Sequence, residues 1–467
     1  MAKSPFTRRD EQREVSRRAL IKWTLACGAG LGVSRSKVYE ILEKHSGKGV
    51  ALAAATCNTK NFIFMAEGSG GLSMMTQFFM PIQGVASARN PAFSWAGDST
   101  TGDLGSAMVG TDFPAWTYGD DPWKSRTAEM YPAAFFGGTN TTHNDDVTTT
   151  TFGINGKSIP AFAAELQVQS LPFIVPALAI GVNPGPSSVP FATAGNVAAA
   201  TALFDSLASR ANGLLSISGN ADLYAQHQDV LVALNKVAKN PVQGVDTIKG
   251  AARFVGKNLA AQLQVTAAEI LQFAGTSTLS NGATRYAQAL IFALKAMQLG
   301  LTHTIAFRGF TNDPHGFFDS GIAGARAELK VIRQIVKSFI EKADTVIDPV
   351  CGAPLSRNLV IAGSGDTYKA PFNQGGWGDG TPGNSSIIFT YSGGDIKSGW
   401  HGNVTQAGGP TVLNAAGQNI AYNANLGLRA AMGGIAYSLT NRDKRAAETY
   451  LGGPMDDLMI HYRPLIS

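Results

Sequence analysis

The strongest constraint on the fold is an alternation of amphipathic and apolar segments between residues 286 and 362. Residues 286–299 and 321–343 carry apolar side chains at the three- and four-residue spacing of a helix, whereas residues 302–310 and 358–362 read as buried strands. Strands that alternate with amphipathic helices form a parallel sheet with right-handed crossovers. The sequence therefore predicts an α/β fold with a mostly parallel sheet.

Further elements extend this pattern toward both ends of the chain. Residues 61–66 form an apolar run that ends in a glycine-rich turn, which is typical of a buried strand, and residues 387–391 form a similar run. Residues 158–169 and 425–450 are predicted helices, and residues 171–180 are a predicted strand that prolines interrupt. These elements add to one sheet and its helices.

The regions between these elements differ in composition. Residues 81–151 are rich in Gly, Pro, Thr, Asp and Trp without a sustained period, so we expect long loops with short pieces of structure. Residues 195–280 have leucines at helical spacing and are predicted to form a helical insertion. A single domain over residues 56–467 is the simplest organisation, and two domains are the alternative at this length.

The N-terminus carries an export motif. It consists of Ser16, Arg17, Arg18 and Lys22. This pattern, a short apolar stretch and alanine-rich cleavage sites behind it are the parts of a twin-arginine leader. We therefore expect residues 1–55 to be a signal peptide that the twin-arginine translocase recognises, and the mature chain to be periplasmic or extracellular. The alternative is that the arginine pair belongs to a charged N-terminal helix.

The net charge of +5 comes from this leader. Residues 1–55 hold eleven of the 38 basic side chains but five of the 33 acidic ones, which leaves 27 basic and 28 acidic groups in the rest. A mature chain with a net charge near −1 lacks the basic face that nucleic acid requires, so we expect no nucleic-acid partner. Since a membrane span needs roughly 20 apolar residues and no such run is found, no span is expected either.

Two of the three cysteines, Cys57 and Cys351, lie beyond the leader. Two cysteines in an exported protein fit one disulfide, because the compartment is oxidising. Two separate buried thiols fit the sequence equally well. The sequence leaves both alternatives open.

Polar side chains follow three of the predicted strands. They are Glu67, Ser69 and Ser73 after the first strand, Asp313 and His315 after the second, and Asp366 and Asp379 after the third. Ligands of open α/β sheets bind beyond the carboxyl ends of strands, so we expect these groups to gather at one edge. Carboxylates with an imidazole suit a divalent metal or a general acid–base site.

Each of these segments also has a structural interpretation. The Asp-Pro-His-Gly run that begins at Asp313 favours a turn, and Ser364-Gly-Asp-Thr fits an Asx-type cap. Glu67 suits a structural acceptor, and His401 suits packing in a turn, with stacking or ligand binding as the alternative. The glycine-rich turn after residues 61–66 lacks the lysine of a P-loop and the spacing of a dinucleotide motif, so nucleotide binding is not expected.

These parts together resemble one protein group. The residues that carry the resemblance are the leader, Phe64 to Leu72, Asn312 to Gly316, Leu359 to Thr367 and Gly393 to Gly399. They resemble the twin-arginine-exported branch, a domain of unknown function, of the alkaline-phosphatase-like or sulfatase-like superfamily. The resemblance spans residues 61–402.

The resemblance implies a three-layer α/β/α sandwich and metal-dependent hydrolysis of phosphate or sulfate esters. Asp313 and His315 match the family's Trp-Asp-Thr-His segment, and Asp366 lies in the match to its Gly-Arg-Thr segment. The implied cofactor is one divalent metal, zinc or calcium. Ser69 and Ser73 are the candidate nucleophiles, since they occupy the place of the family's early Pro-Ser-His stretch.

The chain departs from the family at two ligand positions. The early stretch has no histidine, and the segment around Asp379 lacks the histidine of the family's Gly-Arg-Asp-His. An incomplete ligand set favours one weakly bound metal or none. The alternative function is therefore a catalytically inactive surface protein that binds glycans or forms an assembly. The aromatic residues that favour this alternative are Trp95, Trp116, Trp123, Trp377 and Trp400.

Overall fold

A computed structural model of the protein describes part of the chain. The described residues are 60–67, 123, 126–127, 130, 132–137, 153–167, 175–208, 230–231, 233–235, 258–309, 322–349, 351–367, 386–397, 399–401, 403–404, 410–413, 419–421 and 423–455. The chain forms two compact units, of which the smaller comprises Met1–Ala55, Leu171–Ile174 and Thr201–Gln264. The central sheet belongs to the larger unit. The predicted leader and domain boundaries stay predictions.

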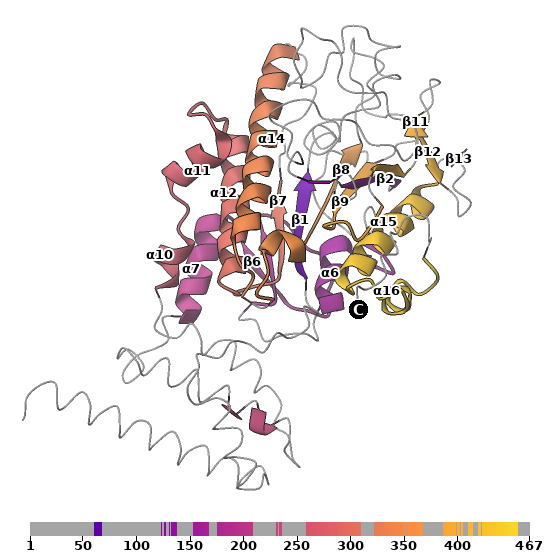
Figure 1. Cartoon of the computed structure of the whole chain (residues 1–467), viewed down its shortest axis with the longest axis horizontal. Coiled ribbons are helices and arrows are strands. Elements are labelled where there is room, and N and C mark those ends of the chain that lie inside the picture. The colour runs from indigo at the N-terminus through magenta and orange to yellow at the C-terminus, as the bar shows by residue number, and fades with distance from the viewer. Residues whose placement is uncertain are drawn as a thin grey trace, which may run out of the picture. The chain divides into compact units, whose positions relative to one another are not determined.

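The larger unit contains an eight-stranded mixed sheet with the order β10-β2-β9-β8-β1-β7-β5-β6 (Figure 1). The strands are β1 (Asn61–Glu67), β2 (Ala133–Gly137), β5 (Ala177–Ile180), β6 (Phe191–Ala194), β7 (Thr304–Arg308), β8 (Leu359–Thr367), β9 (Ser386–Tyr391) and β10 (Gly399–His401). All neighbours in this sheet are parallel except where β9 pairs with β8 and β2. The predicted α/β fold with a mostly parallel sheet is confirmed.

Three predicted strands lie side by side in the middle of this sheet. Phe64 of β1 pairs with Ala306 of β7 and with Ala362 of β8, in parallel on both sides. The prediction that these segments share one sheet is confirmed. β8 continues to Thr367, however, so the predicted loop after Ala362 begins too early. The corrected strand includes Asp366.

Eight α-helices have both ends within the described part of the chain. They are α6 (Ile159–Gln167), α7 (Val197–Ala208), α10 (Leu259–Leu263), α11 (Ala267–Ala274), α12 (Asn281–Gln298), α14 (Ile322–Thr345), α15 (Ala424–Leu439) and α16 (Lys444–Leu451). The predicted helices over residues 158–169, 286–299 and 321–343 correspond to α6, α12 and α14. The predicted helix over residues 425–450 is two helices, α15 and α16. None of the described helices is both long and apolar enough to cross a membrane.

Capping side chains fix where several helices begin and end. The Thr266 hydroxyl accepts a hydrogen bond from the Glu269 N–H at 3.2 Å, and the Glu269 carboxylate accepts one from the Thr266 N–H at 2.8 Å, which forms a capping box for α11. Gly275 ends this helix in the left-handed conformation, with φ of 68°. Asn423 and Asp443 cap the first turns of α15 and α16.

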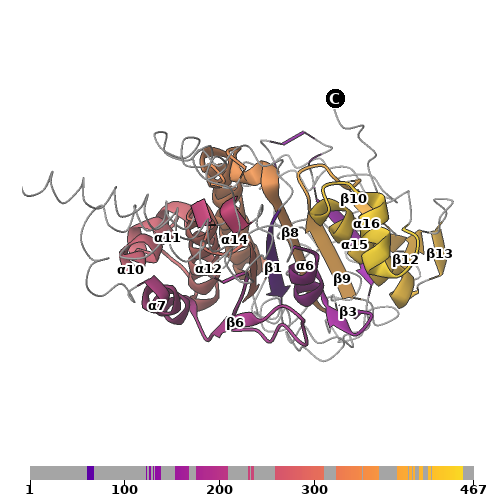
Figure 2. The ribbon, with the colours of Figure 1, turned by 90° about the horizontal axis from the view of Figure 1, so that it is seen from below.

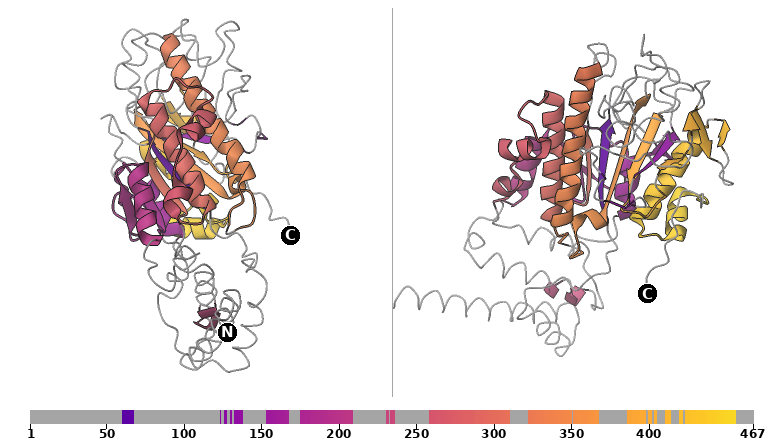
Figure 3. Two further views of the ribbon diagram at one scale, coloured as in Figure 1. Left: turned by 90° about the vertical axis from the view of Figure 1, so that its left-hand side faces the viewer. Right: turned by 45° about the horizontal axis from the view of Figure 1, so that its top comes forward.

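Helices contact both faces of the sheet. Phe64 of β1 belongs to a buried apolar cluster with Phe162 of α6 and Met432 of α15. The next residue, Met65, accepts a hydrogen bond from the hydroxyl of Tyr286 in α12 at 3.0 Å. Successive strand side chains point to opposite faces, so these contacts lie on opposite faces of β1. Figure 2 and Figure 3 show α12 and α14 on one side of β1 and α6 and α15 on the other.

Smaller elements complete the described structure. β11 (Asn403–Val404), β12 (Pro410–Leu413) and β13 (Asn419–Ala421) form a three-stranded antiparallel sheet. β3 (Gly153–Ile154) and β4 (Lys157–Ser158) form a hairpin. Its turn residues Asn155 and Gly156 have φ of 54° and 74°, which is the geometry that favours Asn-Gly in a tight hairpin.

The sequence-based prediction missed several strands. β2 lies within residues 81–151, where long loops with short pieces of structure were expected without any strand being assigned, and it pairs in the sheet with β9 and β10. β6 lies just before the predicted helical insertion. The strand predicted over residues 171–180 is confirmed for Ala177–Ile180, which form β5. These strands are short, so their apolar patterns are weak.

Candidate functional site

The carboxyl ends of β8, β1 and β7 lie at one edge of the sheet. Ser364 of β8 pairs with Ala66 of β1, and Ala66 pairs with Arg308 of β7, so the three strands end at nearly the same height. Glu67, the last residue of β1, pairs with Gly365. The three segments in which the sequence predicts functional groups therefore leave this carboxyl edge from adjacent strands.

Of the predicted metal ligands, Asp366 falls within the described structure. It is the second-last residue of β8, so it belongs to a strand and not to the expected loop, because β8 extends to Thr367. The other predicted site residues, apart from Glu67 and Cys351, lie outside the described residues. They are Ser16, Arg17, Arg18, Lys22, Cys57, Ser69, Ser73, Asp313, His315 and Asp379.

The strand order determines how far apart the ends of β7 and β8 lie. β7 and β8 are separated by β1, so their ends are about 10 Å apart at the usual strand spacing. Asp313 is the fifth residue after Arg308, and five extended residues span roughly 16 Å.

The predicted set of three carboxylates and one imidazole has the chemistry of a divalent-cation site. Within the described ranges, no group of three or more His, Cys, Asp or Glu side chains could hold a metal ion. Asp366 alone of the set falls in these ranges, so such a site would need the residues that follow β7 and β8. The donor chemistry of the predicted set suits such an ion, and Asp366 is its one member that the structure describes.

A buried hydroxyl lies directly beneath the carboxyl edge. Ser364 is 2% exposed, and its Oγ has no hydrogen-bond partner in the described structure. Its strand neighbours Ala66 and Ile388 belong to the apolar cluster that faces α6 and α15, so Ser364 is on that face. The sequence left open whether Ser364 belongs to a functional loop or to a cap after the strand. The structure instead places it on β8.

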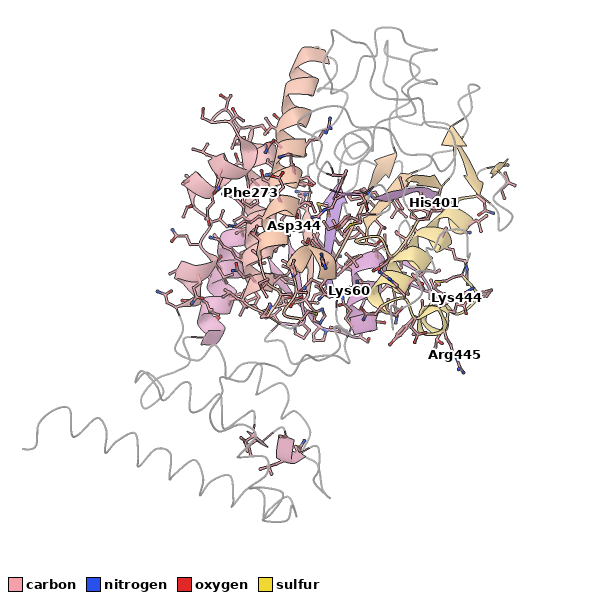
Figure 4. The ribbon with its side chains drawn as sticks, in the orientation of Figure 1. Lys60, Phe273, Asp344, His401, Lys444 and Arg445 are labelled. Carbon is pink, nitrogen blue, oxygen red and sulfur yellow. The ribbon has the colours of Figure 1, made fainter. Side chains whose placement is uncertain are left out.

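His401 has a packing role in the described structure. Its ring stacks on Phe135 of β2, with centroids 4.6 Å apart and planes 9° from parallel. Its Nε2 lies 2.8 Å from the carbonyl oxygen of Lys397, to which it donates. Figure 4 labels His401 on the β2 side of the sheet. His401 thus packs by stacking from strand β10, and not in the turn that the sequence favoured.

At the opposite, amino edge of the sheet, charged groups are paired. Lys60 precedes β1, and its Nζ lies 3.0 Å from Oδ2 of Asp395. The Nε of Arg442, between α15 and α16, lies 2.6 Å from Oδ1 of the same carboxylate. Figure 4 labels Lys60 at the start of β1. This amino-edge triad joins segments far apart in sequence, and sequence reasoning missed it because its charges are isolated along the chain.

A second amino-edge carboxylate orders the segment that precedes β8. Asp348 Oδ2 accepts hydrogen bonds of 2.7 Å from Nδ2 of Asn61 and from Nδ2 of Asn358. Its Oδ1 accepts from the backbone N–H of Cys351 at 3.4 Å. Cys351 is disulfide-bonded. The two other cysteines of the chain, Cys27 and Cys57, lie outside the described residues.

Trp123 is fully buried and stacks on Tyr391 of β9, with centroids 5.0 Å apart. Burial raises the pKa of the Tyr391 hydroxyl to about 12. Nearby, an Arg126 Nη atom lies 2.6 Å from Oδ1 of Asp344. A tryptophan in this position is a core residue, so Trp123 offers no surface for a glycan.

His303, just before β7, is a further buried titratable group that the sequence did not single out. Burial lowers the pKa of its imidazole to about 4. Its Nδ1 lies 2.8 Å from Oγ1 of Thr304, which also accepts a hydrogen bond from Nε2 of Gln167. His303 lies at the amino edge and is neutral near pH 7, so its position indicates a structural role.

Comparison of the chain with protein-family models, with curated proteins and with solved structures finds no match.

Proposed function

We propose that the protein is an exported, metal-dependent hydrolase of phosphate or sulfate esters with an alkaline-phosphatase-like, three-layer α/β/α fold. One observation carries the proposal. β8, β1 and β7 are parallel neighbours, and each precedes or contains one of the predicted functional segments. Active sites of open α/β sheets form beyond the carboxyl ends of such strands.

In this proposal, Asp313, His315, Asp366 and Asp379 hold one zinc or calcium ion. The bound ion would polarise an ester oxygen and neutralise charge on the leaving group. Ser69 or Ser73, which follow β1 closely, would supply the nucleophilic hydroxyl. The proposal is supported by the middle position of β1, which lies between β7 and β8 in the sheet.

The test measures turnover and metal content of the purified mature protein. 4-Nitrophenyl phosphate and 4-nitrophenyl sulfate are offered with and without EDTA, and bound metal is measured by elemental analysis. We expect turnover of one ester that EDTA abolishes and that Asp366→Asn reduces. Glu341→Gln is the control, because Glu341 lies on α14, is 47% exposed and pairs with Lys337. Metal-free protein without turnover of either ester would favour the inactive glycan-binding or assembly-forming alternative.

We also propose that residues 1–55 direct export through the twin-arginine translocase to the periplasm or beyond. The motif of Ser16, Arg17, Arg18 and Lys22 supports this route. Replacing both arginines by lysine should leave the precursor in the cytoplasm, as measured by cell fractionation. Normal appearance of the double variant in the envelope would contradict the proposal.

The disulfide partner of Cys351 is proposed to be Cys57. Asn61 and Cys351 both donate to Asp348, so the start of β1 is held next to the Cys351 turn. Cys57 is four residues before Asn61, and four residues span up to roughly 14 Å. Mass spectrometry of a non-reduced digest should find a peptide that links Cys57 to Cys351. A peptide that links Cys27 to Cys351 would contradict both the pairing and cleavage of the leader before Cys57.

A further inference from the structure

We infer that Arg442 is a strained latch in the turn between α15 and α16. Its ion pair with Asp395 holds its own backbone in the left-handed conformation, and that conformation directs α16 back onto α15 and the β3–β4 hairpin. The latch opens when the carboxylate loses its charge. It is a conformational device of the C-terminal helices and is independent of the proposed function.

Two successive left-handed residues follow α15. They are Asn441, with φ of 54°, and Arg442, with φ of 70°. The Asn441 N–H donates to the Ser438 carbonyl at 3.2 Å, and the Arg442 N–H donates to the Tyr437 carbonyl at 2.8 Å. These bonds form a Schellman motif, which requires the left-handed conformation at Asn441 alone. The conformation of Arg442 therefore needs another cause.

Arginine adopts this conformation at a cost, because its Cβ comes too close to the following carbonyl oxygen. Asparagine is better suited to it, since its short polar side chain bonds locally. Among the residues that the structure describes, Arg442 is the only left-handed residue that is neither glycine nor asparagine. Such strain persists where the surrounding structure enforces it.

The amino-edge triad supplies the enforcing contact. The Nε of Arg442 lies 2.6 Å from Oδ1 of Asp395, while the Nζ of Lys60 lies 3.0 Å from Oδ2. The carboxylate cannot easily follow the arginine, because the backbone N–H groups of Asp395 and Ile396 both donate to Oγ of Ser392 at 3.1 Å. The arginine backbone must therefore adapt to a fixed, buried carboxylate.

The position of α16 depends on this turn. An isolated helix of eight residues is unstable in water, so α16 relies on its contacts. Ala447 and Leu451 are buried, and the Leu451 carbonyl accepts a hydrogen bond from Nδ2 of Asn155 in the β3–β4 hairpin at 3.3 Å. Figure 2 shows α16 beside α15. Since Arg442 is two residues before α16, its φ determines the direction in which the helix leaves the turn.

Neutralising Asp395 removes the cause of the strained conformation. Arg442 and Lys60 would then face each other without the carboxylate that both contact, and like charges repel. The left-handed backbone would lose its compensation. We expect the turn to relax and α16 to detach from the β3–β4 hairpin while the central sheet stays folded.

The first experiment measures the strain by urea denaturation of Arg442→Gly and Arg442→Ala. Both variants remove the ion pair, but only glycine removes the Cβ that makes the left-handed conformation costly. We expect the equilibrium constant of unfolding to be about fivefold smaller for Arg442→Gly than for Arg442→Ala. Thr449, which is exposed within α16, is the control position. There the order should reverse, because glycine disfavours a helix interior.

The second experiment measures detachment of α16 by amide hydrogen exchange with mass spectrometry. We expect α16 amides to exchange at least about tenfold faster in Asp395→Asn than in the wild type, at times at which α12 amides remain protected in both proteins. If Asp395→Asn does not fold, Arg442→Ala replaces it, since it removes the same ion pair from the other side.

Equal stability of Arg442→Gly and Arg442→Ala would overturn the strain at Arg442. Unchanged exchange of α16 while α12 stays protected would overturn the latch, because the helix would then keep its place without the ion pair.

Discussion

The Nζ of Lys60 lies 3.0 Å from Oδ2 of Asp395, and this contact joins the start of the central strand β1 to the segment that follows β9. The carboxylate is 2% exposed, and Arg442 approaches its other oxygen at 2.6 Å. One buried carboxylate thus pairs with two cations at the amino edge. Its removal would leave both cations without their counter-charge.

We therefore expect Asp395→Asn to lower the free energy of unfolding by about 3 kcal/mol, the usual result of breaking a buried ion pair from one side. Urea denaturation at pH 7 measures the change. The control is Glu341→Gln, which removes a half-exposed i,i+4 pair with Lys337 and should cost less than about 0.5 kcal/mol. Equal effects of the two variants would contradict a special role for the triad.

The buried imidazole of His303 should make the folded protein less stable in mild acid. Burial lowers the pKa of its imidazole from 6.5 to about 4 in the folded protein. Between these pH values the unfolded chain binds a proton that the folded protein does not, so stability falls as the pH drops from about 6.5 toward 4. The full effect is on the order of 3 kcal/mol.

Denaturation midpoints at pH 7.0, 6.0 and 5.0 measure this dependence. His303→Gln keeps a polar side chain at the position but does not titrate, so its stability should change less over the same range. An identical pH slope in the variant and the wild type would show that other groups determine the acid response.

A close approach of strand and helix predicts the effect of a single methyl group. A Cβ added to Gly137 of β2 would lie 2.6 Å from the backbone nitrogen of Leu428 in α15, and backbone cannot move aside easily. Gly137→Ala should lower the melting temperature, with a loss of about 1–3 kcal/mol. Gly195→Ala is the control, because no atom lies within 4 Å of its added Cβ. Equal stability of both variants would show that α15 can shift away from β2.

The central strands were predictable from sequence because they are buried on both faces and read as continuous apolar runs. The end of β8 was not predictable from sequence in this way. Gly363 and Gly365 look like turn residues, but a side chain at Gly363 would overlap the ring of Phe389 on the neighbouring strand. Position 363 needs glycine because the Phe389 ring of the neighbouring strand packs against it. The amino-acid sequence alone does not reveal this contact.

The order of strands could not be read from sequence either. β9 and β2 pair antiparallel although more than 240 residues separate them, and neither segment contains information about its partner. For the same reason, the sequence predicted that functional groups follow β1, β7 and β8, but could not show that β1 lies between the other two. The amino-edge triad of Lys60, Asp395 and Arg442 depends on the same long-range pairing.

The most direct test of the proposed carboxyl-edge site is equilibrium binding of zinc to the metal-stripped mature protein. The proposal predicts one high-affinity equivalent of Zn²⁺ in the wild type and in Glu341→Gln, and an affinity at least about tenfold lower in Asp366→Asn and in His315→Ala. The same titration with Ca²⁺ identifies the preferred ion. Equal zinc affinity of Asp366→Asn and the wild type, or no binding of either ion to the wild type, would contradict a metal site at the ends of β8, β1 and β7.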